Sequence, residues 1–117
     1  MTQITDKQPM PRPVRAGLVG FGWWGKTIFK ELQGSQNFKV IGIAETSGFT
    51  RSAMNTDSQL EGITIHDNFQ DLLKQSELEV VILCSPHEYH AQQILMAAEA
   101  NKHVFCEKPL CLSLSDA

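Results

Sequence analysis

Residues 14–25 constrain the fold of this chain more than any other segment. A short apolar stretch, Val14–Val19, runs directly into the pattern Gly-x-Gly-x-x-Gly, and a helical pattern follows at once. In that arrangement Gly20 permits the tight turn off a strand, Gly22 lets a pyrophosphate approach the backbone, and Gly25 lets the helix pack closely on the sheet. The free N–H groups at the start of the helix favour phosphate. The segment predicts a dinucleotide site, and the alternative is a glycine-rich turn with a purely structural role.

The residues between these glycines are Phe21, Trp23 and Trp24, and we predict that they contact the cofactor together with the glycines. We expect one tryptophan to pack into the fold and the other to lie near the mouth of the cofactor site. The sequence does not decide which of the two does which.

An acidic residue, Glu45, follows Gly25 by twenty residues at the end of the next apolar stretch. A carboxylate there can accept hydrogen bonds from the ribose hydroxyls of an adenosine and would repel a 2′-phosphate. The spacing therefore predicts NAD rather than NADP as the cofactor. Two alternatives stay open. Glu45 is a solvated loop acid, or Arg51, nearby in sequence, binds a 2′-phosphate and the cofactor is NADP.

Composition excludes several classes of protein. The chain has 117 residues, of which 42% are hydrophobic, which suits one globular domain with a real core. The net charge is −3 with the signs well mixed, so neither nucleic acid nor a membrane surface is expected as a partner. Three cysteines without a regular spacing favour a reducing compartment, and we expect a cytoplasmic protein.

Short apolar stretches alternate with helical patterns, as in βαβ units around a parallel sheet. We predict an α/β domain of three αβα layers over residues 14–117, with a doubly wound, mostly parallel sheet (a Rossmann fold), after a flexible lead-in over residues 1–13. Strands are expected over Val14–Val19, Phe38–Ala44, Ile63–His66, Glu79–Cys84 and Lys102–Cys106. Helices are expected over Trp23–Gln33, near Phe49–Asn55, from a cap at Asp67 to Gln75, and over His87–Asn101.

The last residues contain Ser113 and, three positions later, Asp116, which is similar to a capping box. We therefore expect a helix to begin there, and the chain to be the front domain of a longer protein.

Two further clusters of chemically active residues follow predicted strands at the carboxyl edge of the sheet, where dinucleotide folds bind their cofactor. The first is Ser85-Pro86-His87-Glu88-Tyr89-His90, and the second is Glu107-Lys108-Pro109. Without further context the second is a surface Glu-Lys pair at a strand end.

No metal site is predicted. The segment His87-Glu88-Tyr89-His90 has one residue between Glu and the second His, whereas the zinc-protease helix needs two. His103, Cys106 and Cys111 lack the paired second half of a zinc site.

Taken together, Gly20-x-Gly22-x-Trp24-Gly25, Ser85-Pro86-x-x-x-His90 and Glu107-Lys108-Pro109 resemble the glucose–fructose oxidoreductase / inositol dehydrogenase / MocA family over nearly the whole chain. The resemblance implies a nicotinamide-dependent oxidoreductase with an N-terminal Rossmann domain. It also implies a C-terminal α/β domain, absent here, that holds most of the substrate site. Family substrates are sugars, cyclitols and related polyols, which react at a secondary alcohol, and the full-length proteins are homo-oligomers.

The resemblance also implies roles for single residues. Lys108 matches the active-site lysine at the nicotinamide end, where an ammonium can stabilise alkoxide character on the substrate oxygen. Glu107 matches a cofactor-contacting acid. Ser85 stands where the family usually has threonine, and His87 where it often has asparagine.

Pro86 turns the chain at the sheet edge, and His90 matches a family histidine. For His90, direct cofactor contact and a structural role near a helix start both stay open.

We expect this chain to bind cofactor without turnover, because the family's further catalytic Asp and His belong to the second domain. One alternative is a non-catalytic member of the family that senses NAD. Another is a methyltransferase, whose sheet also has a glycine-rich first turn, although Glu107-Lys108-Pro109 speaks against it.

Overall fold

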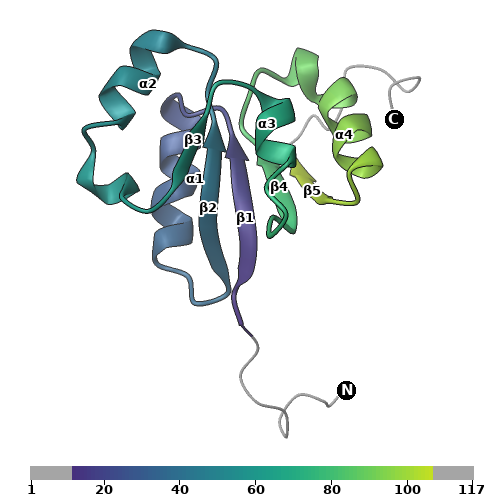
Figure 1. The fold of residues 1–117 in the computed structure, drawn as a ribbon, viewed down its shortest axis with the longest axis horizontal. Coiled ribbons are helices and arrows are strands. Elements are labelled where there is room, and N and C mark those ends of the chain that lie inside the picture. Colours follow the sequence, from purple (N-terminus) through teal and green to yellow (C-terminus); the bar gives the residue numbers. More distant parts are fainter. Residues whose placement is uncertain (1–11, 107–117) are drawn as a thin grey trace, which may run out of the picture.

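A computed structural model describes residues 12–106, except for the side chain of His87. Its five strands form one parallel sheet in the order β3-β2-β1-β4-β5 (Figure 1). The strands are β1 (Val14–Val19), β2 (Phe38–Ala44), β3 (Thr64–His66), β4 (Val80–Leu83) and β5 (His103–Cys106). The helices are α1 (Trp23–Gln33), α2 (Gly48–Met54), α3 (Phe69–Leu73) and α4 (His90–Glu99), with the 3₁₀ turns η1 (Ser58–Leu60) and η2 (His87–Tyr89). The predicted doubly wound α/β fold is confirmed.

Helices cover both faces of the sheet, so its central strands are apolar on both sides (Figure 1). On one face Phe29 of α1 and Met54 of α2 pack with Leu18 and Ile43 of the sheet. On the other face, α3 and α4 contribute Phe69, Leu72 and Ala97 to a second cluster with Val19, Ala44, Val81 and Leu83. Within residues 12–106 no helix is long and apolar enough to cross a membrane.

The order of the strands reverses beside β1. The chain moves outward from β1 to β2 and β3, and then returns to place β4 on the other side of β1. The loops that leave β1 and β4 therefore run to opposite faces of the sheet, which opens a crevice at their carboxyl ends. The fold thus brings the glycine loop and the Ser85-Pro86 turn to one edge.

The predicted cap of the third helix is wrong by one residue. Asn68, not Asp67, caps α3, because its Oδ1 accepts a hydrogen bond from the Asp71 N–H at 2.8 Å. The Asp67 carboxylate instead lies 3.2 Å from Nε of Arg51 on α2. The other predicted elements differ from the observed ones mainly at their ends; α4, for example, begins at His90 after the turn η2.

An acidic residue ties the start of β1 to β4. Oε1 of Glu79 accepts hydrogen bonds from the Arg15 N–H at 2.8 Å and from Nη1 of Arg12 at 3.0 Å, and Oε2 accepts one from Nη2 of Arg12 at 2.6 Å. These hydrogen bonds, from Arg12 above all, lower the pKa of the Glu79 carboxyl from its ordinary 4.5 to about 2. The carboxylate thus favours the folded state wherever it is ionised.

We predict that Glu79→Gln lowers the melting temperature at pH 7, because the amide cannot form the same charged pair with Arg12. The pKa of Glu79 is lower in the folded state, so its stabilisation is complete above pH 4.5 and is lost as the pH falls toward 2. Thermal melts of the unmodified and variant chains should therefore converge over that range. Glu99→Gln, which removes an exposed carboxylate from α4, should leave the melting temperature unchanged at pH 7. A Glu79→Gln difference that is as large at pH 2 as at pH 7 would contradict this account.

Candidate functional site

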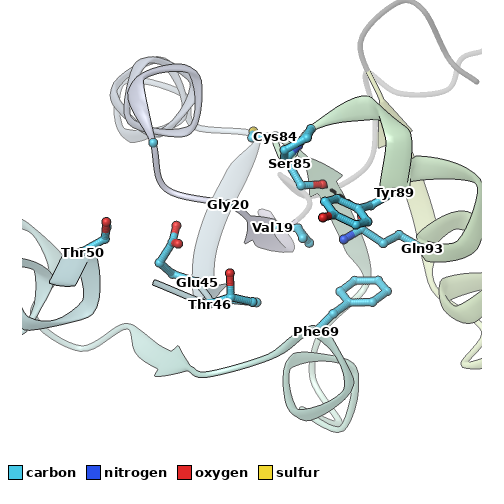
Figure 2. A pocket seen from close by; sticks show the side chains of 13 residues that line it. Val19, Gly20, Glu45, Thr46, Thr50, Phe69, Cys84, Ser85, Tyr89 and Gln93 are labelled. Atoms are coloured by element: carbon cyan, nitrogen blue, oxygen red, sulfur yellow. Dashed lines mark hydrogen bonds between the residues drawn. The ribbon is translucent and has the colours of Figure 1, made fainter. Parts of the chain in front are cut away.

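A cavity of about 580 Å³ opens where the strands end, in the size range of small-ligand sites. It is lined by Val19, Gly20, Gly22, Ala44, Glu45, Thr46, Thr50, Phe69, Cys84, Ser85, Pro86, Tyr89 and Gln93. Figure 2 shows Glu45, Thr46 and Thr50 on one side of the cavity, and Ser85, Tyr89 and Gln93 on the other. Five predicted site residues meet here: Gly20, Gly22, Glu45, Ser85 and Pro86.

The three glycines of the motif have different surroundings. Gly20 has a φ of +95°, and a Cβ there would lie 3.1 Å from the carbonyl group of Cys84. A Cβ on Gly25 would overlap the carbonyl oxygen of Gly20, which means that α1 starts against the turn itself. A Cβ on Gly22, by contrast, would meet nothing within 4 Å. The fold therefore needs glycine at 20 and 25, whereas the lack of a side chain at 22 leaves open space beside the cavity.

The Glu45 carboxylate connects the glycine loop to the loop after β2. Its Oε1 accepts a hydrogen bond from the Phe21 N–H at 2.6 Å, and its Oε2 accepts one from the Ser47 N–H at 2.9 Å. An ionised carboxylate has about four lone-pair positions, so each oxygen can accept a further hydrogen bond. Glu45 is held in one orientation at the cavity wall, rather than being a freely solvated loop acid.

Phe21 contributes to the core rather than to the cavity wall. Its side chain is buried and meets the ring of Phe29 edge-on, with the ring centroids 5.7 Å apart. Its N–H group connects it to the cavity only through the bond to Glu45, which does line the wall.

The expectation that one tryptophan packs into the fold is wrong. Trp23 is 79% exposed and Trp24 is 37% exposed, and their rings stack on each other with centroids 6.0 Å apart. The reason is the phase of α1, which turns Gly25 and Phe29 toward the sheet. Neither indole lines the cavity.

The opposite wall combines hydroxyl, amide and aromatic groups. The Ser85 hydroxyl donates to Oε1 of Gln93 at 2.7 Å, which links the loop after β4 to α4. The aromatic side chains of Tyr89 and Phe69 also line this part of the cavity (Figure 2).

Eight lining residues were not predicted as site residues: Val19, Ala44, Thr46, Thr50, Phe69, Cys84, Tyr89 and Gln93. They come from several elements, and none of them occupies a fixed position of a motif. The available signal was weak, namely that several of them lie shortly after a strand end.

His90 is buried, and it does not line the cavity. Its Nε2 lies 2.8 Å from the Ser85 carbonyl oxygen and its Nδ1 lies 2.9 Å from Sγ of Cys106. A neutral ring with its proton on Nε2 satisfies both contacts, because the carbonyl only accepts and the thiol can donate to Nδ1. This geometry favours the structural interpretation of His90, in which it holds the Ser85-Pro86 turn against the end of β5.

The remaining predicted site residues are Glu107, Lys108 and the side chain of His87, and all three lie outside the described residues. Among residues 12–106, no three His, Cys, Asp or Glu side chains are grouped so that they could hold a metal ion.

Comparison with known proteins places this geometry in context. The profile of the Gfo/Idh/MocA family, described as an oxidoreductase family with an NAD-binding Rossmann fold, matches residues 14–117. The inositol 2-dehydrogenase of Salmonella typhimurium is 30% identical over 105 residues, which are 88% of this chain and 31% of that protein. The chain thus spans about a third of the length of the curated relatives it matches.

Solved structures show the same fold. The scyllo-inositol dehydrogenase of Lactobacillus casei, crystallised with NAD(H) and scyllo-inositol, superposes with a TM-score of 0.77 at 26% identity, over 90% of this chain and 31% of that one. An oxidoreductase of Desulfitobacterium hafniense named as NADPH-dependent superposes with a TM-score of 0.81 at 24% identity, over 92% of this chain and 30% of that one. The second likeness is evidence for the fold alone.

The unequal surroundings of Gly22 and Gly25 generate a paired prediction. Gly25→Ala should lower the free energy of unfolding by about 1–3 kcal/mol, because the new methyl group overlaps the Gly20 carbonyl. Gly22→Ala should leave the melting temperature unchanged but weaken dinucleotide binding on the order of tenfold, because its methyl group occupies the space beside the cavity. Thermal melts and calorimetric titrations check the two effects separately. Equal effects of both variants on stability would refute the assignment.

Proposed function

The chain belongs to the Gfo/Idh/MocA oxidoreductase family, and from that premise we propose that it is the cofactor-binding domain of an NAD-dependent dehydrogenase. The proposed reaction transfers hydride between the nicotinamide and a secondary alcohol or carbonyl of a sugar, cyclitol or related polyol. One observation carries the proposal above all: the cavity joins the open backbone at Gly22 to the fixed carboxylate of Glu45.

The described residues fit the adenosine and pyrophosphate parts of such a cofactor. The backbone at Gly20 and Gly22 offers a close approach to a pyrophosphate, and the free positions on the Glu45 carboxylate suit ribose hydroxyls. Phe69 and Tyr89 supply apolar ring faces on which a base can pack. When bound, the nicotinamide supplies the hydride acceptor or donor.

We propose NAD rather than NADP as the cofactor. The Glu45 carboxylate is held at the cavity wall by two backbone N–H groups, so it cannot turn away from an added 2′-phosphate without losing both bonds. Repulsion between the Glu45 carboxylate and the 2′-phosphate disfavours NADP. The NAD(H) bound to the Lactobacillus casei enzyme supports this choice.

The reaction itself is assigned to residues at the end of the chain. Lys108 is proposed to hydrogen-bond the reacting oxygen of the substrate and to stabilise its negative character, and Glu107 to contact the cofactor. The substrate site is proposed to belong mostly to a second domain, because the curated relatives are about three times as long as this chain. A homo-oligomeric full-length protein and a cytoplasmic location complete the proposal.

We predict that the chain binds NAD more tightly than NADP in calorimetric titrations, and that S-adenosylmethionine gives no heat of binding. Glu45→Gln should weaken NAD binding by about three- to tenfold, because the amide has a single acceptor oxygen, so it loses one of the two backbone N–H bonds and is a poorer acceptor for the ribose hydroxyls. Glu61→Gln, which removes an exposed carboxylate outside the cavity, is the matched control and should leave binding unchanged. Tighter binding of NADP by the unmodified chain would overturn the role proposed for Glu45. Binding of S-adenosylmethionine but not of NAD would overturn the proposal that the chain is part of a dehydrogenase.

We also predict that this 117-residue chain does not reduce NAD when it is mixed with inositols or sugars. The reason is that most of the substrate site is assigned to a second domain. Absorbance at the NADH band follows the reaction directly. Sustained turnover by the chain alone would show that these 117 residues carry a complete active site.

A further inference from the structure

We propose that Asp67 is a positioning residue for cofactor selectivity, because it holds the Arg51 guanidinium away from the place of a 2′-phosphate. This inference rests on the proposed function and extends it from Glu45 to a second carboxylate. It assigns to Asp67 and Arg51 a role that the cavity lining alone does not reveal.

The arrangement follows from the sheet. Ala44 at the end of β2 pairs with His66 at the end of β3, so the next residues, Glu45 and Asp67, leave adjacent strands together. The Glu45 N–H donates to the His66 carbonyl at 3.0 Å, which continues the pairing by one residue. Two acidic residues therefore mark the same corner of the sheet, beside the cavity.

Arg51 lies between these two loops. It is six residues beyond Glu45, and its Nη1 donates to the Glu45 backbone carbonyl at 2.7 Å. Its Nε lies 3.2 Å from Oδ1 of Asp67. Thr50, its neighbour on α2, lines the cavity, whereas Arg51 does not. The guanidinium thus lies just outside the cavity wall and faces oxygens of its own chain.

A guanidinium in this region is a natural ligand for a 2′-phosphate, because its planar fork binds phosphate through two parallel hydrogen bonds. In this chain the Arg51 guanidinium already has two partners: the Glu45 carbonyl at Nη1 and the Asp67 carboxylate at Nε. A 2′-phosphate would have to draw Arg51 from Asp67 and would also meet the charge of Glu45. Both carboxylates consequently act against NADP, Glu45 by direct repulsion and Asp67 by retaining the cation.

Asp67 is much more exposed than Arg51, so Arg51 can be separated from it at little cost. The Arg51 side chain is 26% exposed, whereas that of Asp67 is 73% exposed. An ion pair with so exposed a carboxylate is weak, so its loss should cost the fold little. The Glu45 carbonyl would still hold Nη1, and the guanidinium would then have its Nε side available to turn toward the ribose corner.

The test is Asp67→Asn in the full chain, with the dissociation constants of NAD and NADP measured by calorimetry at low salt. We expect NADP affinity to rise by about two- to fivefold and NAD affinity to stay unchanged. The double variant Asp67→Asn/Arg51→Gln should lose the gain. Asp71→Asn, which removes an equal charge paired with Lys74 on the surface, should not produce it.

A merely structural role of Asp67 would change both affinities together, so the ratio of the two is the deciding quantity. An unchanged ratio in Asp67→Asn, or a gain that survives in the double variant, overturns this inference and leaves the proposed function standing. Failure of the unmodified chain to bind either cofactor overturns the proposed function and the inference with it. Should Asp67→Asn melt at a lower temperature, Asp67→Ser, which also removes the charge, supplies the same comparison.

Discussion

The close contact between α1 and the turn that precedes it is the constraint on which the rest of this structure depends. Gly25 lies directly against the Gly20 carbonyl, and Gly20 adopts a positive φ in order to turn away from β1. Because the helix begins so early, Phe29 reaches the core four residues later, while the turn keeps Gly22 clear of other atoms. One packing requirement thus fixes both the first layer of the fold and the opening of the cavity.

Glu45 belongs equally to the fold and to the proposed site. In binding two N–H groups, its carboxylate satisfies donors from two separate loops and fixes the distance between them. The same bonds orient the carboxylate for a ribose, so the site is preorganised before any ligand arrives. A substitution at Glu45 therefore changes loop geometry as well as charge, and Gln, which keeps the size and one of the two acceptor oxygens, disturbs the loops less than Ala.

The sequence was most informative where a single residue type has one physical use. The three motif glycines and the buried runs of β1 and β2 predicted their elements to the residue, because few other structures accommodate them. The cap of α3 was misplaced because Asp67 and Asn68 are both good caps; in the structure Asn68 caps the helix and Asp67 pairs with Arg51 of α2, a tertiary contact that the local sequence does not reveal. Eight residues of the cavity wall were missed for a similar reason: the sheet brings them together from elements that share no motif.

The two walls of the cavity are held by different interactions, and one of them connects the cavity to the end of β5. The wall at Glu45 is fixed by hydrogen bonds to a carboxylate, whereas the turn at Ser85 is held by neutral hydrogen bonds to Gln93 and His90. His90 also contacts Cys106, the last residue of β5, which directly precedes Glu107 and Lys108 in the sequence. A single buried imidazole therefore links the turn at the cavity to the strand that leads to the proposed catalytic lysine. Two hydrogen bonds of His90 thus hold the turn against the end of β5, although His90 itself does not line the cavity.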